Sequence, residues 1–366
     1  MTKNLGVDKI FLFSVIFLTA IGFAVFLSAS MGILAKDSAQ FSSIAFKQVF
    51  FGIILGFIVC FIFSKINYKI LKKYALPFFF FSLILVSLVF IPELGLSLNG
   101  AKRWISIFGF SFQPVALLNL GFVVYWSAWL SFTKDKVQQF KYGPLPLVII
   151  LSIIGSLLLL QPDTDSFFVI CFTGLVMLIV AGGKFKHILF LGILGVVCLA
   201  VIAFSRPYIM TRIESYINPS INSLSSGYQL QQSLIAVGSG QIFGRGFGQS
   251  IQKFKFLPES ISDSIFAVLG EELGFVGCVF ILCLFLFLVF RGFRIAIRAP
   301  DSFGGLLVVG IVIIIMFQSL VNITSVLGII PISGIPLAFF SQGGTAMFLV
   351  LAQIGIVLNV SKYVKN

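Results

Sequence analysis

Long apolar runs follow one another along almost the whole chain, and short polar segments separate them. A helix needs about 20 apolar residues to cross the hydrocarbon core of a bilayer, and about ten runs approach that length. We predict spans at residues 10–31, 46–64, 75–92, 114–132, 145–160, 166–182, 187–205, 264–290, 303–327 and 335–360. The sequence therefore predicts an all-α polytopic membrane protein that forms a single membrane domain over residues 1–366.

The composition agrees with this class of protein. Of the 366 residues, 59% are hydrophobic and only 10% are charged, and the mean hydropathy is +1.11. Soluble globular proteins carry about 25% charged residues, because a folded chain needs a wetted polar surface. A soluble enzyme and a disordered regulator are therefore excluded. Attraction to anionic lipid headgroups explains the net charge of +13, and we expect no nucleic-acid partner.

The distribution of Lys and Arg predicts which end of the bundle faces the cytoplasm. With the N-terminus inside, most of the 25 cations fall in cytoplasmic segments, as the positive-inside rule requires, and both termini are cytoplasmic. The longest connection, the loop at about residues 206–263 between the seventh and eighth spans, is then extracytoplasmic. Within it, residues 228–236 alternate apolar and polar side chains, and we interpret them as an amphipathic helix on the bilayer surface.

The positions of the cysteines and of the histidine exclude histidine catalysis and soft-metal clusters, and we interpret the cysteines as small hydrophobic residues. All five cysteines lie within apolar runs without metal-ligand spacing. The single histidine, His187, follows two nearby lysines at a helix end, which is typical of a solvated flank. Acid–base chemistry must therefore come from the 12 carboxylates. Those on or near the predicted outer face are Asp163, Asp165, Glu214, Glu259, Asp263, Glu271 and Glu272.

Asp263 is the most informative of these carboxylates. It ends the long polar loop immediately before the eighth span, where the free N–H groups of a helix start favour an acid. Two interpretations stay open from the residues alone: a helix N-cap, which Ser262 could also supply, or a functional acid. Glu271 and Glu272 follow deeper in the same helix, and at least one of them should point into the bundle as a polar clamp between helices.

Several cations in the extracytoplasmic loop run against the positive-inside rule and are candidates to bind an anion. Arg binds phosphate by bidentate donation and Lys binds it as a point charge. Residues 238–248 form a glycine-rich stretch whose backbone N–H groups could approach an anion, although a turn without a ligand is the alternative. The stretch lacks the setting of a nucleotide P-loop. A lipid phosphate or pyrophosphate would suit such a site. The loop cations are Arg206, Arg212, Arg245, Lys253 and Lys255.

Short motifs spread over most of the chain resemble those of one known family. The motifs are residues 99–105 (NGAKRWI), 112–114 (FQP), 161–163 (QPD), 227–234 (GYQLQQSL), 252–259 (QKFKFLPE), 263–267 (DSIFA), 270–274 (GEELG), 317–318 (FQ), 321–323 (VNI) and 336–344 (PLAFFSQGG). In this order they resemble the SEDS family (shape, elongation, division and sporulation), which includes FtsW, RodA and SpoVE. The motifs at 227–234, 252–259 and 270–274 are more similar to FtsW than to RodA.

The resemblance implies a peptidoglycan glycosyltransferase that polymerises lipid II outside the cytoplasmic membrane. Asp263 matches the catalytic aspartate of the family, whose proposed role is general base toward the acceptor sugar hydroxyl. The leaving group is undecaprenyl pyrophosphate, and Lys102, Arg103 and Arg245 are candidates to offset its charge. The resemblance and the loop residues together give an expected substrate-binding set. Its members are Lys102, Arg103, Gln161, Asp163, Arg212, Gln232, Ser233, Arg245, Lys253, Glu259 and Ser341.

The resemblance also implies partners and a location. The expected partner is a class B penicillin-binding protein (FtsI-like) that cross-links the glycan product, together with other divisome proteins. We expect the chain in the bacterial cytoplasmic membrane, at the division septum. No metal ligands are predicted in the chain, and a divalent cation, Mg²⁺ or Mn²⁺, is the one candidate cofactor.

Several positions depart from the family pattern. The family has Ser-Glu after FQP and a Lys three residues beyond that Glu, whereas this chain has Val115, Ala116 and Asn119. The apolar-Gly-Thr that follows QPD is replaced by residues 164–166 (TDS). His-Thr-Asp-Phe around the acid is replaced by residues 261–264 (ISDS), and the late Ser-Tyr-Gly-Gly by residues 341–344 (SQGG).

Two alternative functions stay open beside the polymerase. One is a flippase or other transporter of a lipid-linked precursor, which would be expected to show inverted repeats and broken helices at the bilayer midplane. The sequence shows no such halves, and its acids gather at one face. The other is a divergent, non-catalytic scaffold for a class B penicillin-binding protein, which the altered Ala116 and Asn119 motivate.

Overall fold

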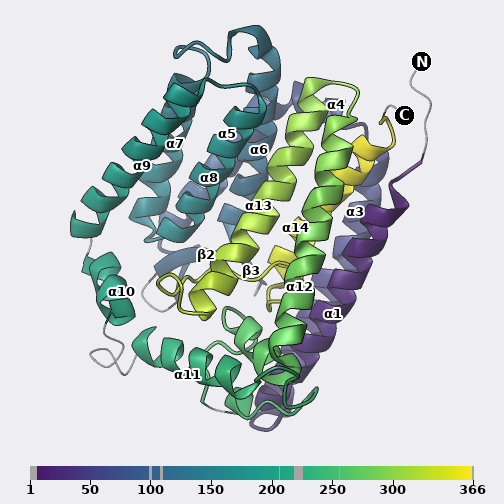
Figure 1. The fold of residues 1–366 in the computed structure, drawn as a ribbon, viewed down its shortest axis with the longest axis vertical. Helices are drawn as coiled ribbons and strands as arrows, with labels where there is room; N and C mark the ends of the chain where they lie inside the picture. The colour runs from purple at the N-terminus through teal and green to yellow at the C-terminus, as the bar shows by residue number, and fades with distance from the viewer. Residues whose placement is uncertain are drawn as a thin grey trace.

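The computed structural model describes residues 6–98, 101–107, 110–205, 207–217, 226–254 and 256–364. Long helices run side by side along its longest axis (Figure 1). Both ends of the chain lie at the same end of this bundle, where the Asp8 N–H donates to Ser361 Oγ at 3.0 Å. In the part of the chain that is described, seven helices are long and apolar enough to cross a membrane, and three shorter apolar helices accompany them. The chain is an integral membrane protein.

A helix lies at or near each predicted span. Several of these helices begin where the sequence supplies a cap: Asp8, Asp37 and Asp301 each accept a backbone N–H at a helix start. The bundle helices are α1 (Lys9–Leu34), α2 (Ser38–Phe46), the π-helical η1 (Lys47–Ile54), α3 (Leu55–Lys65), α5 (Ala75–Ser87), α6 (Pro114–Phe132), α7 (Pro144–Leu160), α8 (Thr164–Val180), α9 (Phe185–Ser205), α12 (Ile265–Ile297), α13 (Ser302–Val326) and α14 (Gly344–Ser361). Shorter helical segments are α4 (Lys69–Lys73), η2 (Leu88–Phe90) and η3 (Lys134–Lys136).

The prediction of a last span at 335–360 is wrong at its beginning. The chain is irregular from Leu327 to Gly343, and α14 starts only at Gly344. Side chains of α13 satisfy part of this backbone, since Gln318 Nε2 donates to Pro336 O at 3.1 Å and Asn322 Nδ2 donates to Ile335 O at 2.8 Å. Irregular backbone is tolerated at membrane depth where protein surrounds it and supplies its hydrogen bonds.

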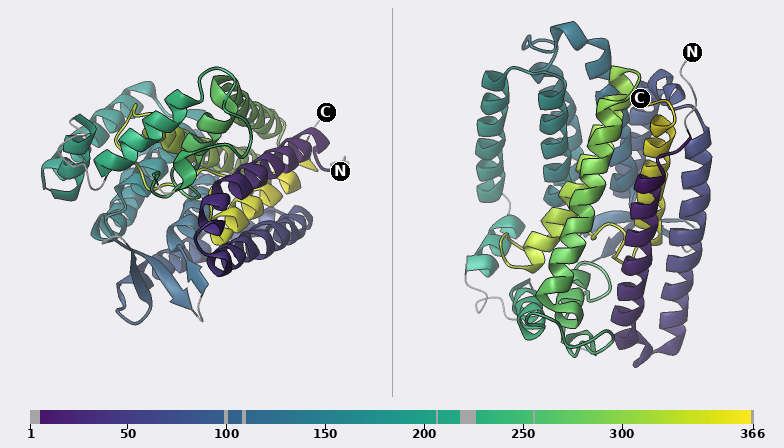
Figure 2. Two further views of the ribbon diagram at one scale, coloured as in Figure 1. Left: turned by 90° about the horizontal axis from the view of Figure 1, so that it is seen from below. Right: turned by 45° about the vertical axis from the view of Figure 1, so that its right-hand side comes forward.

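The all-α prediction is also wrong for the segment before α6. Strands β1 (Gly95–Leu98), β2 (Ala101–Ile107) and β3 (Phe110–Phe112) form an antiparallel sheet in the order β1-β2-β3. Leu96 pairs with Trp104, and Ile105 pairs with Phe112. The segment is too short and too polar to cross a bilayer, so its backbone groups pair between strands instead. Seen from below, the strands project from one side of the bundle (Figure 2).

The long loop contains helices α10 (Pro207–Ile217), α11 (Ser226–Ser239) and the short η4 (Gln252–Phe254). These elements lie at the end of the bundle opposite the chain termini (Figure 1). Helix α11 confirms the helix predicted from residues 228–236, and it packs its buried Leu230, Ser233 and Ala236 toward the bundle. The loop returns to α12, whose backbone breaks at Gly274, where φ is +65°.

Close packing of α1 against the irregular segment before α14 depends on Gly22. A Cβ on Gly22 would collide with the carbonyl group of Phe339, which belongs to the irregular segment before α14. We expect Gly22→Ala to lower the free energy of unfolding by about 1–3 kcal/mol, because this backbone contact cannot give way without moving the segment. Thermal unfolding in detergent would measure the change.

Gly192 supplies the matched control for Gly22. It lies in α9, and a Cβ there would meet no atom within 4 Å. Gly192→Ala should be neutral or should stabilise the helix by up to about 1 kcal/mol. Equal losses in the two variants would show that the contact with Phe339 does not limit the substitution.

Candidate active site

Asp263 lies in the loop immediately before α12, at the end of the bundle that carries the long loop. The N-cap of α12 is Ser264, and no side chain supplies a cap hydrogen bond there. Asn322 Nδ2 donates to the backbone carbonyl of Asp263 at 2.8 Å and so fixes the residue from α13. The interpretation of Asp263 or Ser262 as the helix cap is therefore wrong, and among the described residues nothing hydrogen-bonds to the Asp263 carboxylate.

Charged groups from three other parts of the chain surround the Asp263 carboxylate. Burial raises the pKa of Asp263 to about 7, with a further rise from the nearby Glu259 carboxylate. The Arg103 guanidinium acts in the opposite direction, Asp165 raises the pKa again, and Arg212 lowers it. The carboxyl group can therefore exchange a proton near neutral pH, which a solvated aspartate cannot do efficiently.

Two arginines lie near Asp263, and each is held by its own carboxylate at the start of α8. Arg103 of β2 lies 3.8 Å from Asp163, donates through Nε to Gln161 O at 3.4 Å, and donates to Pro162 O. Arg212 of α10 donates to Asp165 Oδ2 at 2.8 Å. Asp163 also caps α8 by accepting the Ser166 N–H. The start of α8 thus fixes two guanidinium groups at the edge of the site.

The residues on either side of Asp263 are held by hydrogen bonds from the irregular segment and from α11. Ser341 Oγ donates to Ser262 O at 2.6 Å, and Gln229 Nε2 donates to Ser264 Oγ at 2.9 Å. Within the loop, Ser262 Oγ donates to the Glu259 carboxylate at 2.6 Å. Of the predicted substrate-binding residues, Ser341 is therefore a buried support for the site, whereas Glu259 is exposed beside it.

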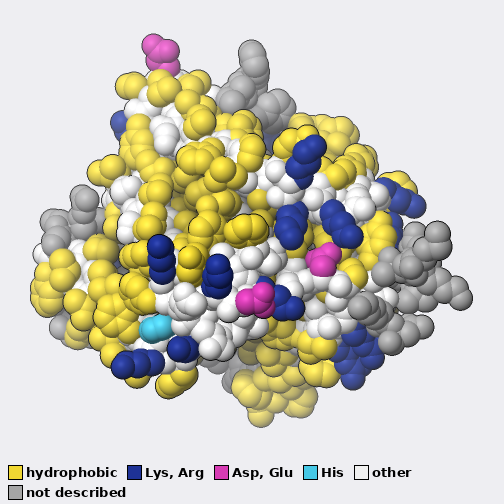
Figure 3. Space-filling view, turned by 90° about the horizontal axis from the view of Figure 1, so that it is seen from above, with side chains coloured by type: hydrophobic (Ala, Val, Ile, Leu, Met, Phe, Trp, Pro, Cys, Tyr) yellow, Lys and Arg dark blue, Asp and Glu magenta, His cyan; other side chains and the backbone are white. Residues whose placement is uncertain are grey.

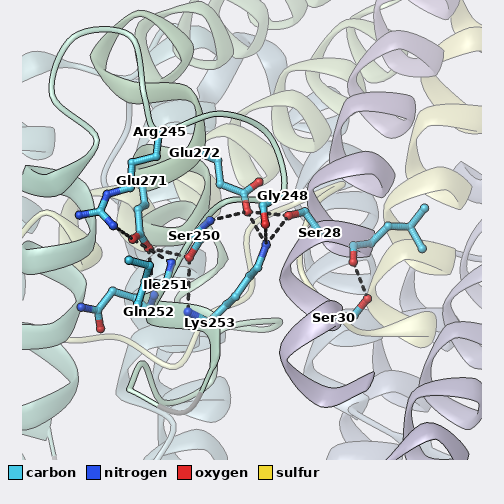
Figure 4. Close-up of polar contacts among 11 residues, drawn as sticks. Ser28, Ser30, Arg245, Gly248, Ser250, Ile251, Gln252, Lys253, Glu271 and Glu272 are labelled. Atoms are coloured by element: carbon cyan, nitrogen blue, oxygen red, sulfur yellow. Dashed lines mark hydrogen bonds and ion pairs between the residues drawn. The ribbon is translucent and has the colours of Figure 1, made fainter. Parts of the chain in front are cut away.

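The glutamates of α12 form a buried polar cluster that holds the loop against α1 (Figure 4). Glu272 Oε1 accepts hydrogen bonds from Lys253 Nζ at 2.7 Å and from Ser28 Oγ at 2.6 Å. Glu271 accepts from Ser250 Oγ at 2.6 Å and from two backbone N–H groups of the loop. Both glutamates point into the structure, so the prediction of a polar clamp is confirmed.

The cluster changes the interpretation of two predicted substrate-binding cations. The Lys253 side chain is 0% exposed and paired with Glu272, so in this arrangement it cannot contact substrate directly. Arg245 lies 3.6 Å from Glu271 and keeps 37% of its side chain exposed. Phosphate capture by Lys253 would require breaking a buried ion pair, which is costly.

The other predicted residues fall in different places. Gln161 is buried and donates to Val86 O at 2.7 Å, so it supports the fold. Lys102 is exposed on β2, Gln232 is partly exposed on α11, and Ser233 is buried. The loop cations Arg206 and Lys255 lie outside the described residues. So do residues 99–100, which begin the 99–105 motif.

A small cavity lies between α6, α8, α13 and α14 and reaches the irregular segment at Gly334. Ala116 and Asn119, which replace the Glu and Lys of the family pattern, both line it. Asn119 Oδ1 and Gln353 Oε1 are buried there without a hydrogen-bond partner. A neutral cavity thus occupies the positions of the charged pair, and the loss of both charges together leaves no unpaired ion behind.

Within the described ranges, no three His, Cys, Asp or Glu side chains converge as a metal would need. Mg²⁺ is commonly bound by one or two carboxylates together with substrate phosphates, so a divalent cation stays a prediction of the sequence.

Comparisons with known proteins agree with this architecture. The family described as "Cell cycle protein", which covers FtsW, RodA and SpoVE, matches residues 8–366. A probable peptidoglycan glycosyltransferase FtsW of Geobacter sp. (strain M18) is 37% identical, over 99% of this chain and 98% of the relative. Stage V sporulation protein E of Bacillus subtilis (strain 168) is 38% identical, over 99% of both chains.

Two solved structures share the fold. A chain of a peptidoglycan synthase complex that coordinates polymerization and crosslinking is 27% identical, with a TM-score of 0.80 over 98% of both chains. Rod shape determining protein RodA of Thermus thermophilus is also 27% identical, with a TM-score of 0.71 over 98% of this chain and 97% of that chain.

The fold and these similarities thus define a membrane-embedded glycosyltransferase. The chain belongs to the FtsW/RodA/SpoVE family, as the sequence motifs predicted.

Proposed function

We propose that the chain polymerises lipid II into glycan strands on the outer face of the bacterial cytoplasmic membrane, with Asp263 as general base. The observation that carries this proposal is the position of Asp263: a partly buried acid with no capping role, beside two arginines that are anchored by their own carboxylates. An acid that serves neither the helix nor an ion pair is available to a reaction.

The proposed reaction follows from these groups. The Asp263 carboxylate takes the proton of the acceptor sugar hydroxyl while that oxygen attacks the anomeric carbon of the donor. The bond from the anomeric carbon to the pyrophosphate oxygen breaks, and undecaprenyl pyrophosphate leaves. Arg103 and Arg212, whose charges act on Asp263, would stabilise the negative charge that develops on the leaving group.

We infer a topology of ten spans with both termini in the cytoplasm, within one membrane domain over residues 1–366. Lys and Arg side chains are distributed over the end that carries the termini (Figure 3), as the positive-inside rule requires of a cytoplasmic face. The Asp263 site lies at the opposite end, which is where lipid II would be consumed.

The rate of polymerisation should depend on pH through Asp263. Because the pKa is raised to about 7, half of the carboxyl groups are protonated at that pH, and a protonated acid cannot act as a base. We expect the rate to rise with pH and to reach half its maximum near pH 7, in initial-rate measurements on labelled lipid II. Glu259→Gln removes a neighbouring negative charge, so it should lower the pKa of Asp263 and move this half-point to lower pH. A rate independent of pH in this range would contradict the proposed base.

We also propose a class B penicillin-binding protein as partner and a role in cell division at the septum. The similarity to a chain of a peptidoglycan synthase complex supports such a partner, and relatives of the FtsW type support division. Co-purification with the penicillin-binding protein of the same divisome would test the partner.

Incubation of the purified protein with fluorescent lipid II, alone and with its partner, tests the activity and separates the alternatives. Glycan chains resolved by gel electrophoresis would support the polymerase. Translocation of lipid II across proteoliposomes without chain formation would indicate the transporter. An intact complex without chains would favour the scaffold, which the neutral Ala116–Asn119 cavity motivates.

A further inference from the structure

Asp165 is a carboxylate outside the family motif that borders the Asp263 site. It lies in the 164–166 segment (TDS), where the family pattern has an apolar residue followed by Gly-Thr. Its Oδ2 atom accepts hydrogen bonds from Arg212 Nη1 at 2.8 Å and from the Gly334 N–H at 3.3 Å. The side chain is only 18% exposed, so this carboxylate is not a solvated flank of α8.

These contacts join three segments that are far apart in the sequence: the start of α8, helix α10, and the irregular segment between α13 and α14. Helix α10 reaches the same irregular segment a second time, because Tyr216 Oη donates to Ile329 O at 2.9 Å. The Asp165 carboxylate is the one group among these contacts that binds both α10 and the segment.

Gly334 places this junction directly beside the proposed base. A Cβ on Gly334 would lie 3.6 Å from Arg103 Nη1 and 3.7 Å from Asp263 Oδ2. The peptide that donates to Asp165 therefore forms part of the wall of the site beside both Arg103 and the proposed base. A displacement of this wall or of Arg212 by about 1 Å can cost a hundredfold in rate.

We propose that Asp165 is a positioning residue, which fixes Arg212 and Gly334 beside Asp263 and so makes α10 part of the site. This inference rests on the proposed function and adds a residue that the family motif does not supply. A guanidinium held by a partly buried carboxylate loses less rotational freedom when it binds a pyrophosphate than a free arginine would.

The substitution that tests the proposal is Asp165→Asn, which keeps the size of the side chain and removes its charge. We expect kcat/KM for lipid II to fall by between about tenfold and a hundredfold. Asp165→Glu should recover part of the loss. In the Arg212→Ala background the same substitution should have a smaller effect, because one of its two partners is already gone.

Asp8 provides the matched control. Its ion pair with Arg291 has the same 2.8 Å separation and a similar exposure, 16% for Asp8 and 23% for Arg291, but it lies at the terminal end of the bundle. Asp8→Asn should leave kcat/KM within about twofold of wild type. Equal losses in both variants would overturn the proposal, because they would show a general effect of removing an ion pair. Wild-type kinetics for Asp165→Asn would overturn it as well.

The pH profile distinguishes positioning from a loss of folded protein. The charged groups that face Asp263 are Glu259, Arg103, Asp165 and Arg212. Without the Asp165 charge, the pKa of Asp263 falls, because the positive charges of Arg103 and Arg212 are less neutralised. The pH at which the rate is half-maximal should therefore be lower. Loss of folded protein would reduce the rate at every pH and leave the half-point unchanged, which would contradict the proposal.

A distance measurement separates this proposal from the proposed function. Spin labels at the exposed positions Ile217 of α10 and Ile179 of α8, in a cysteine-free background, report the position of α10 without any substrate. Asp165→Asn should broaden the distance distribution, and Asp8→Asn should not. An unchanged distribution would overturn the role of Asp165 even where polymerisation is intact. A broadened distribution in a protein whose wild type makes no glycan would overturn the polymerase and leave the positioning contact standing.

Discussion

Asp263→Asn is expected to reduce the rate of glycan polymerisation by at least about a hundredfold, which is the lower range for loss of a general base. The amide has nearly the shape of the acid but cannot accept the proton of the acceptor hydroxyl. Because the carboxylate serves neither as a helix cap nor as an ion-pair partner in the described residues, its loss removes chemistry and leaves the packing intact. Single-turnover rates with labelled lipid II would measure the effect.

Two controls accompany this variant. Its free energy of unfolding should stay within about 1 kcal/mol of wild type, and its binding of lipid II should be retained. Asp37→Asn changes another acid at the same end of the bundle, an exposed cap of α2, and should leave the rate unchanged. A variant of Asp263 that unfolds or fails to bind substrate would assign the residue a structural or binding role instead.

Lys253→Met is expected to give the largest loss of stability, about 3–5 kcal/mol, because it leaves the Glu272 carboxylate buried without its cation. Lys253 also donates to Ser28 Oγ at 2.9 Å and to Gly248 O at 2.7 Å, so the same substitution releases the loop from α1. Equilibrium unfolding in detergent or by steric trapping would measure the difference.

Two further variants test whether the buried charge causes that loss. Adding Glu272→Gln to Lys253→Met should recover much of the stability, since the unpaired charge is then removed. Arg245→Met removes a cation that is 37% exposed and leaves Glu271 its hydrogen bonds from the loop, so it should cost no more than about 1 kcal/mol. A loss for Arg245→Met equal to that for Lys253→Met would contradict the explanation by burial.

Hydropathy was sufficient to predict the bundle, because an apolar run long enough to cross a bilayer has few other ways to satisfy its backbone. It could not predict the irregular stretch at 335–343, which is as apolar as a helix. The hydrogen bonds that stabilise this stretch come from Gln318 and Asn322, side chains of another helix, and sequence periodicity carries no sign of them. The sheet at 95–112 was missed because β1 and β3 have only 4 and 3 residues, and β2 (AKRWISI) does not alternate strictly between polar and apolar side chains.

The sequence predicts a set of candidate site residues but not their arrangement. Motif and position both indicated Asp263, and the structure excludes the cap that the local sequence left open. In the sequence, Lys253 and Arg103 are equivalent candidates for anion binding. In the structure, Lys253 is buried in an ion pair with Glu272, whereas Arg103 lies near Asp263. The contact of Asp165 with Arg212 joins α8 to α10, and only the tertiary structure brings those segments together.

The most direct test of the central claim is the release of undecaprenyl pyrophosphate from lipid II in reconstituted bilayers, comparing wild type with Asp263→Asn in the complex with the penicillin-binding protein. We expect wild type to release one undecaprenyl pyrophosphate for each glycosidic bond formed and the variant to release almost none. Equal release by both proteins would contradict the role of Asp263 as base. No release by either protein, in an intact complex, would contradict the polymerase itself.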